Sequence, residues 1–192
     1  MIYYATQQTL ERYKLNTPKN FHSKTGDIVR MIANKERGNR LYEWGCKLFY
    51  FDRRKCLQVV HFASKLTIFL IDIKMDDIVY ASNAVAQYIF DIYDGDKMMK
   101  RALERYFESS PIVVFDKITD RSIIATLNKT QSDWAEDGYY FYKFIINGIL
   151  QTKEINRKIN RDWIFTRKVN GKTEYIRSAE EFEKLIKENF KA

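Results

Sequence analysis

Residues 46–73 read CKLFYFDRRKCLQVVHFASKLTIFLIDI and contain three apolar runs, separated by the polar stretches DRRK and ASK. β-Branched and aromatic side chains dominate each run, and this composition between polar breaks is typical of strands. Connections this short join antiparallel neighbours. The stretch therefore predicts a three-stranded antiparallel meander that forms the core sheet.

The patterns on either side of this meander predict helices and two further strands. IYYAT at residues 2–6 predicts a first strand, and a short amphipathic helix follows it. Residues 76–93 repeat apolar side chains near a 3.6-residue period, which predicts the main helix that packs on the sheet. A second helix with Asp96 as its N-cap comes next. Residues 109–117 return to a strand, and residues 119–150 are expected to be rich in helix.

The C-terminal part of the chain predicts a helix, a hairpin and a final helix. A basic helix is expected from about residue 151. Asn170 and Gly171 stand between two β-patterned runs and predict a hairpin, because a type I′ turn requires positive φ at both positions. Ser178 with Glu181 three residues on predicts a capping box that opens the final helix.

These elements predict an α+β fold, in which an antiparallel core meander is packed by helices and followed by a C-terminal β-hairpin and a capping helix. Two organisations fit the chain. In one, residues 1–149 form an α+β core domain, and residues 150–192 form a basic helix-hairpin-helix appendage packed on it. In the other, the whole chain is a single compact domain.

The composition indicates a folded protein that neither spans a membrane nor carries a secretory signal. Hydrophobic residues make up 45% of the 192 residues, and no stretch approaches the roughly 20 apolar residues that a bilayer span needs. Two cysteines and two histidines are too few for a disulfide framework or a structural zinc site. We therefore expect a cytoplasmic protein without a cofactor or metal.

The net charge of +8 is concentrated in two segments. Residues 1–40 carry eight Lys or Arg against three acids, and residues 150–177 carry the same numbers. A basic protein attracts polyanions, so nucleic acid or an acidic partner is favoured, although such a charge also serves solubility alone.

The turn at residues 52–55 has two interpretations. Its four charged residues form a four-residue connection in which Asp52 is the turn acid and the rest meet water. Alternatively Arg53, Arg54 and Lys55 grip a phosphate or carboxylate, because two arginine forks and a lysine concentrate positive potential at one tip.

A second basic surface is expected in the C-terminal unit. Its cations recur along one helix face and around the hairpin turn, which suits the backbone of RNA or DNA but offers no device for reading bases. A solvated helix face is the simpler alternative. The residues are Lys153, Arg157, Lys158, Arg161, Arg167, Lys168 and Lys172.

Other groupings carry weaker signals. Cys56 and His61 are five residues apart on one strand, so they point to opposite faces and cannot act together. Asp52, Asp72 and Lys74 resemble the acids and lysine of a metal-dependent nuclease, but acid-x-Lys arises often by chance. The aromatic run at residues 138–144 is typical of a core and would offer stacking platforms if exposed.

Three stretches together resemble a family of uncharacterised small prokaryotic proteins. They are MIYYATQQTLERYKL at the start, Trp44 with a strand that runs into Arg53–Leu57, and an Arg-Ser-apolar-apolar stretch that leads from Arg121 to Asn128. The resemblance implies a common α+β fold and brings no established activity. Because Arg121 and Asn128 belong to it and share a helix face, they could close a polar pocket.

No reaction and no catalytic residue can be assigned from these patterns. We expect a non-enzymatic intracellular protein that binds nucleic acid or a nucleoprotein through its basic surfaces. The alternative is a protein-binding regulator or inhibitor, antitoxin-like or anti-defence, from a mobile element. A metal-dependent nuclease is a third hypothesis, and the oligomeric state stays open.

Overall fold

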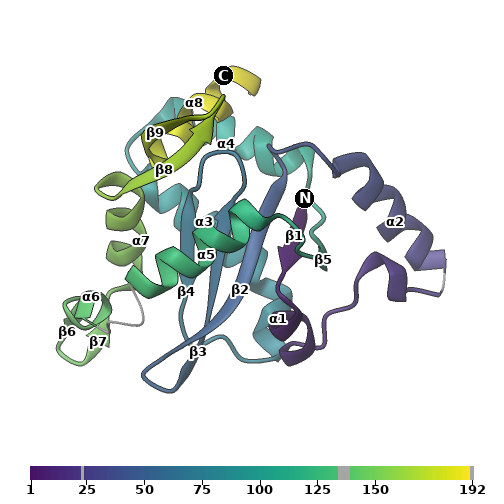
Figure 1. Cartoon of the computed structure of the whole chain (residues 1–192), viewed down its shortest axis with the longest axis horizontal. Helices are drawn as coiled ribbons and strands as arrows, with labels where there is room; N and C mark the ends of the chain where they lie inside the picture. The colour runs from purple at the N-terminus through teal and green to yellow at the C-terminus, as the bar shows by residue number, and fades with distance from the viewer. Residues whose placement is uncertain (23, 134–138, 191–192) are drawn as a thin grey trace.

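The computed structural model describes residues 1–22, 24–133 and 139–190. Its centre is a five-stranded mixed sheet in the order β4-β3-β2-β1-β5 (Figure 1). The strands are β1 Ile2–Ala5, β2 Glu43–Phe51, β3 Arg54–His61, β4 Thr67–Leu70 and β5 Val114–Lys117. The prediction of an α+β fold is confirmed.

The predicted meander is confirmed as β2, β3 and β4, which pair antiparallel in that order. Its first connection is shorter than expected. Only Asp52 and Arg53 form the turn, at φ 49° and 62°, while Arg54 already pairs with Phe51. Positive φ at both positions is the geometry of a type I′ turn, which matches the twist of the flanking strands. The four-residue connection was therefore wrong.

The other half of the sheet is parallel. β1 lies between β2 and β5 and runs parallel to both. Ile2, Tyr3 and Ala5 are buried because neighbouring strands and covering helices surround this central strand. The sequence predicted both strands without indicating their partners.

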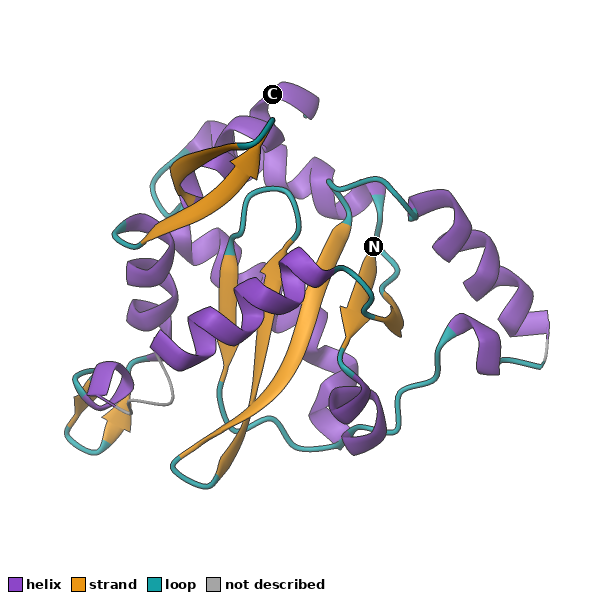
Figure 2. Cartoon of the chain, in the orientation of Figure 1, coloured by secondary structure: helices purple, strands orange, loops and turns teal. Residues whose placement is uncertain are grey.

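Helices cover both faces of the sheet, as Figure 2 shows. On one face, α3 Ala81–Ile92, α4 Lys97–Ser109 and α8 Ser178–Asn189 bury the main core around Trp44. On the other face, α5 Arg121–Gln131 crosses β2 and β3 beside a second cluster that includes Phe49 and Phe69. The remaining helices are α1 Gln7–Arg12, η1 Pro18–Asn20, α2 Lys24–Glu36, η2 Asp76–Tyr80, α6 Tyr139–Tyr142 and α7 Thr152–Arg161.

Two predicted helical segments are more varied than expected. The helix predicted at residues 76–93 begins as the 3-10 helix η2 and continues as α3, while Asp96 caps α4 as predicted. Within residues 119–150 a hairpin follows α5 and α6, formed by β6 Ile145–Ile146 and β7 Ile149–Leu150. It turns at Asn147 and Gly148, at φ 51° and 76°. The aromatic run at residues 138–144 begins at residue 138, which lies outside the described residues.

The C-terminal segment shares its packing with the rest of the chain. The predicted hairpin is present as β8 Ile164–Val169 and β9 Lys172–Arg177, and it turns at Asn170 and Gly171. Phe182 of α8 lies in the main core. The capping box was wrong, because Ser178 is already the first residue of α8 and its hydroxyl donates to Asn160 Oδ1 at 2.8 Å.

Candidate anion-binding groove

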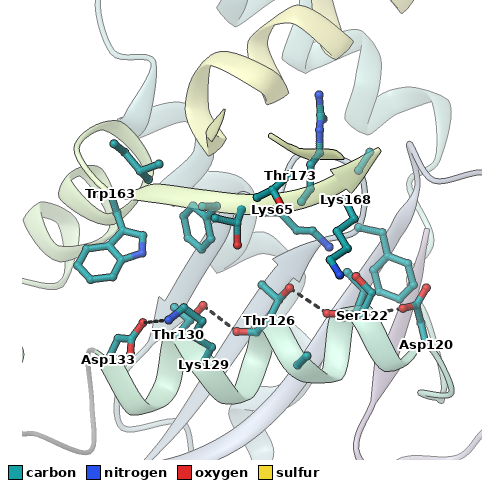
Figure 3. Close-up of a pocket in the computed structure, with 18 of the residues that line it drawn as sticks. Lys65, Asp120, Ser122, Thr126, Lys129, Thr130, Asp133, Trp163, Lys168 and Thr173 are labelled. Atoms are coloured by element: carbon teal, nitrogen blue, oxygen red, sulfur yellow. Dashed lines mark hydrogen bonds and ion pairs between the residues drawn. The ribbon is translucent and has the colours of Figure 1, made fainter. Parts of the chain in front are cut away.

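A groove of about 640 Å³ opens between α5, the β8–β9 hairpin and the turn that joins β3 to β4. Figure 3 shows polar side chains from these segments converging on it. We call it the α5–hairpin groove. The lining residues that bear on its chemistry are Arg40, Lys65, Asp120, Ser122, Thr126, Lys129, Thr130, Asp133, Trp163, Arg167, Lys168 and Thr173.

One wall of the groove is the hydroxyl-bearing face of α5. Asp120 caps this helix by accepting a hydrogen bond from Ile123 N at 3.1 Å. Ser122, Thr126 and Thr130 follow at four-residue intervals, so they form a row along the helix (Figure 3). Thr126 and Thr130 donate their protons to carbonyls one turn earlier. Thr130 is buried, whereas Thr126 is half-buried and its oxygen lone pairs can accept hydrogen bonds from a ligand.

Lys65 lies on the opposite side, in the β3–β4 turn. Its backbone has φ 63° and the residue is only 6% exposed. Burial lowers the pKa of Lys65 from 10.5 to about 8, since removal from water disfavours the ammonium form; Asp120 partly opposes this shift. No ion pair joins Lys65 to a carboxylate of the described residues. Lys65 therefore has Asp120 near enough to act on its charge but forms no ion pair with it.

Among the cations that line the groove, Lys168 on β8 is the second that forms no ion pair with a described residue. Figure 3 shows the side chains of Lys65 and Lys168 both extending into the groove toward α5. Two lysines that enter one cavity favour an anionic ligand, because an anion between them offsets their mutual repulsion.

The other cations of the groove are neutralised locally. Arg167 lies 2.8 Å from carboxylate oxygens of both Glu174 and Glu181. Lys129 and Arg40 have carboxylate partners of their own in Asp133 and Asp120. The lining as a whole carries five cationic side chains against two carboxylates, and Lys65 and Lys168 supply most of the excess.

Most cations predicted in the C-terminal unit lie elsewhere. Lys153 pairs with Asp91 at 2.9 Å, Lys158 pairs with Asp162 at 3.5 Å, and Arg161 donates from Nε to the carbonyl of residue 92 at 3.1 Å. Two further cations, at residues 157 and 172, are exposed and do not line the groove. Of the seven predicted residues, the groove therefore collects only Arg167 and Lys168.

The basic turn formed by Arg53, Arg54 and Lys55 lies at the other end of the sheet from the groove. It stands at the start of β3, whereas the groove begins just beyond His61 at the end of that strand. Seven steps of about 3.3 Å separate the two ends by roughly 23 Å. The two predicted basic surfaces are thus separate.

Arg121 and Asn128 do not line the groove, although they lie on the same helix. Both are exposed, and Asn128 Oδ1 accepts a hydrogen bond from Lys47 Nζ at 2.9 Å. This bond ties α5 to β2. It joins two of the stretches that carry the family resemblance, which gives Lys47 and Asn128 a structural role.

Cys56 and His61 point to opposite faces of β3, as predicted. Cys56 packs in the cluster with Phe49. On the opposite face, the ring centroids of His61 and Trp44 are 4.7 Å apart. His61 Nε2 donates to the carbonyl of Leu41 at 3.0 Å, since a carbonyl only accepts. Burial lowers the pKa of His61 from 6.5 to about 4. The imidazole is therefore neutral at physiological pH.

The nuclease hypothesis gains no metal site from the geometry. Asp52 and Asp72 both lie in exposed positions beyond strand ends. Across residues 1–22, 24–133 and 139–190, no three His, Cys, Asp or Glu side chains gather closely enough to hold a metal ion. In the same ranges, no helix combines the length and apolar character needed to cross a bilayer.

Sequence reasoning missed Lys65 and Trp163 as groove residues. Lys65 belongs to the ASK break, where a lysine is an ordinary turn residue. In the folded chain it is buried and lines the same groove as the β8–β9 hairpin and α5. No local pattern indicates that contact.

The comparisons with known proteins give a family and no activity. The family model described as "Domain of unknown function (DUF6933)" matches residues 2–181. No curated protein and no solved structure matches the chain. The match confirms the resemblance to an uncharacterised family.

Proposed function

The chain belongs to the DUF6933 family, and we propose that it binds single-stranded nucleic acid in the α5–hairpin groove. The observation that carries the proposal is the pair Lys65 and Lys168, two cations without ion-pair partners among the described residues, in one cavity. Phosphate is the anion that nucleic acid repeats along its length, and lysines bind it as point charges.

The rest of the lining suits the sugars and bases of a strand. Trp163 is half-buried and lines the groove, with its ring edge to face against Tyr140 at a centroid distance of 6.2 Å. An indole is a type of ring on which bases stack. The hydroxyl of Thr126 donates its proton within the helix, so its oxygen lone pairs suit the amino and hydroxyl donors of nucleosides. Because bases must be unstacked to reach an aromatic ring, this lining favours a single strand over a duplex.

Fluorescence anisotropy with 12-nucleotide DNA and RNA strands tests the proposal. We expect binding at 50 mM salt whose log affinity falls linearly with log salt. The double variant Lys65→Gln/Lys168→Gln should weaken binding by at least tenfold. It should also reduce the salt slope by about one for each lost phosphate contact.

The matched control is Arg53→Gln/Arg54→Gln, which removes the same charge roughly 23 Å away. It should leave the affinity within about twofold. Equal losses in the two variants would show a response to net charge alone and would contradict the groove, as would a wild type that binds neither strand. Thermal melting should show that both variants are folded.

A further inference from the structure

One end of the molecule combines exposed isoleucines with exposed cations. The turn of the β2–β3 hairpin and the β6–β7 hairpin both project at this end (Figure 1). They are linked by a ring contact, since the centroids of Phe51 and Tyr142 are 5.0 Å apart. We call the two turns and these rings the double-hairpin tip.

The apolar part of the tip is a pair of isoleucines that points away from the core. Ile146 and Ile149 are cross-strand partners and are 59% and 66% exposed. The neighbouring partners Ile145 and Leu150 lie on the other face, where Leu150 packs against the buried cluster. The type I′ turn between the strands is a defined geometry, so this exposure belongs to the fold.

The cationic part of the tip lies on the adjacent hairpin. Arg53 and Arg54 are exposed, Lys55 is half-buried, and no carboxylate within the described residues forms an ion pair with any of them. Asp52 in the same turn is the nearest acid in sequence. Tyr50, opposite Lys55 on the paired strand, is 51% exposed. Cations, a tyrosine and bulky aliphatic side chains therefore share one end.

We propose that the double-hairpin tip binds the surface of a bilayer that contains anionic lipid. The arginines would contact headgroup phosphates while Ile146 and Ile149 enter the boundary with the acyl chains. The shape favours a bilayer over a protein, because the β6–β7 hairpin that carries the two exposed isoleucines projects from the rest of the chain (Figure 1). A fluid surface accepts such a projection, whereas a protein partner would need a matching pocket. Tyrosine at the interface is typical of membrane-bound surfaces.

Vesicle flotation tests this proposal without nucleic acid. We expect the protein to bind vesicles of phosphatidylcholine with 30% phosphatidylserine at least tenfold more strongly than vesicles of phosphatidylcholine alone. Salt should weaken the binding. Arg53→Gln/Arg54→Gln should reduce it at least fivefold, and Ile146→Ser/Ile149→Ser should do the same without any change of charge.

The control is Lys65→Gln/Lys168→Gln, which removes two charges from the groove and should bind vesicles like the wild type. All four residues of the tip variants are exposed, and thermal melting should show unchanged stability. Two results overturn the proposal. One is equal binding to both kinds of vesicle. The other is vesicle binding by the isoleucine variant at the wild-type level. If poly-glutamate then binds the wild type and not Arg53→Gln/Arg54→Gln, the partner of the tip is an acidic protein.

Discussion

Asn160 on α7 and Thr67 on β4 exchange two hydrogen bonds, as neighbouring strands do. Thr67 N donates to Asn160 Oδ1 at 2.8 Å, and Asn160 Nδ2 donates to Thr67 O at 2.6 Å. Asn156 repeats the pattern with Phe69 at 2.7 and 3.0 Å. Four helical residues rise about 6 Å and two strand residues rise about 6.6 Å, so the spacings match. The helix thereby closes the edge of the sheet.

Replacement of Asn160 should destabilise the protein strongly. Asn160→Ala leaves the N–H and C=O of Thr67 buried without partners, at a cost of about 2–4 kcal/mol. Urea unfolding measures this loss. The control is Asn189→Ala, which removes an exposed helical asparagine and should cost less than about 0.5 kcal/mol. Equal effects of the two substitutions would show that the edge contacts contribute little.

Stability should rise with pH between about 4 and 6.5 because of His61. The folded protein keeps this imidazole neutral down to a pKa of about 4, whereas the unfolded chain protonates it below about 6.5. The contribution of His61 to stability is therefore fully present above pH 6.5. The free energy of unfolding falls by about 3 kcal/mol as the pH drops to 4. Urea unfolding at a series of pH values measures the slope, and His61→Gln should flatten it. A variant with the wild-type slope would exclude His61 as its source.

Gly45→Ala should disturb the contact between β2 and α5. A Cβ at this position would lie 2.4 Å from Ile123 Cγ2, so α5 must shift. Such overpacking costs about 1–3 kcal/mol. The double variant Gly45→Ala/Ile123→Ala should lose less stability than the two single variants together, because the second change removes the obstructing methyl. Additive losses in thermal melting would contradict this account.

If the α5–hairpin groove binds nucleic acid, its affinity should fall as the pH rises through about 8. Lys65 has a pKa of about 8, so its ammonium is present below that pH and is lost above it. Anisotropy titrations from pH 6.5 to 9 should show the decline. Lys65→Arg retains its charge throughout this range and should show a smaller decline. An unchanged pH dependence in this variant would remove Lys65 from the binding site.

Local patterns sufficed where neighbours in sequence are also neighbours in space. The β2–β4 meander and the hairpin at Asn170 rest on strand periodicity and turn chemistry, which a few adjacent residues specify. The same Asn-Gly signal at Asn147 lies within residues 119–150, which were expected to be rich in helix, and there it forms the turn between β6 and β7. Capping by Asp96 was likewise readable, since the cap and its helix are contiguous.

The sequence by itself determined an α+β fold, a core meander and a net charge of +8. The tertiary structure alone decided that β1 runs parallel between β2 and β5, because parallel partners are distant in the chain. It also decided the candidate site, where Lys65, α5 and Lys168 come from three separate segments. Charge can be counted along a chain, but whether a cation meets a carboxylate or a cavity depends on contacts between distant residues.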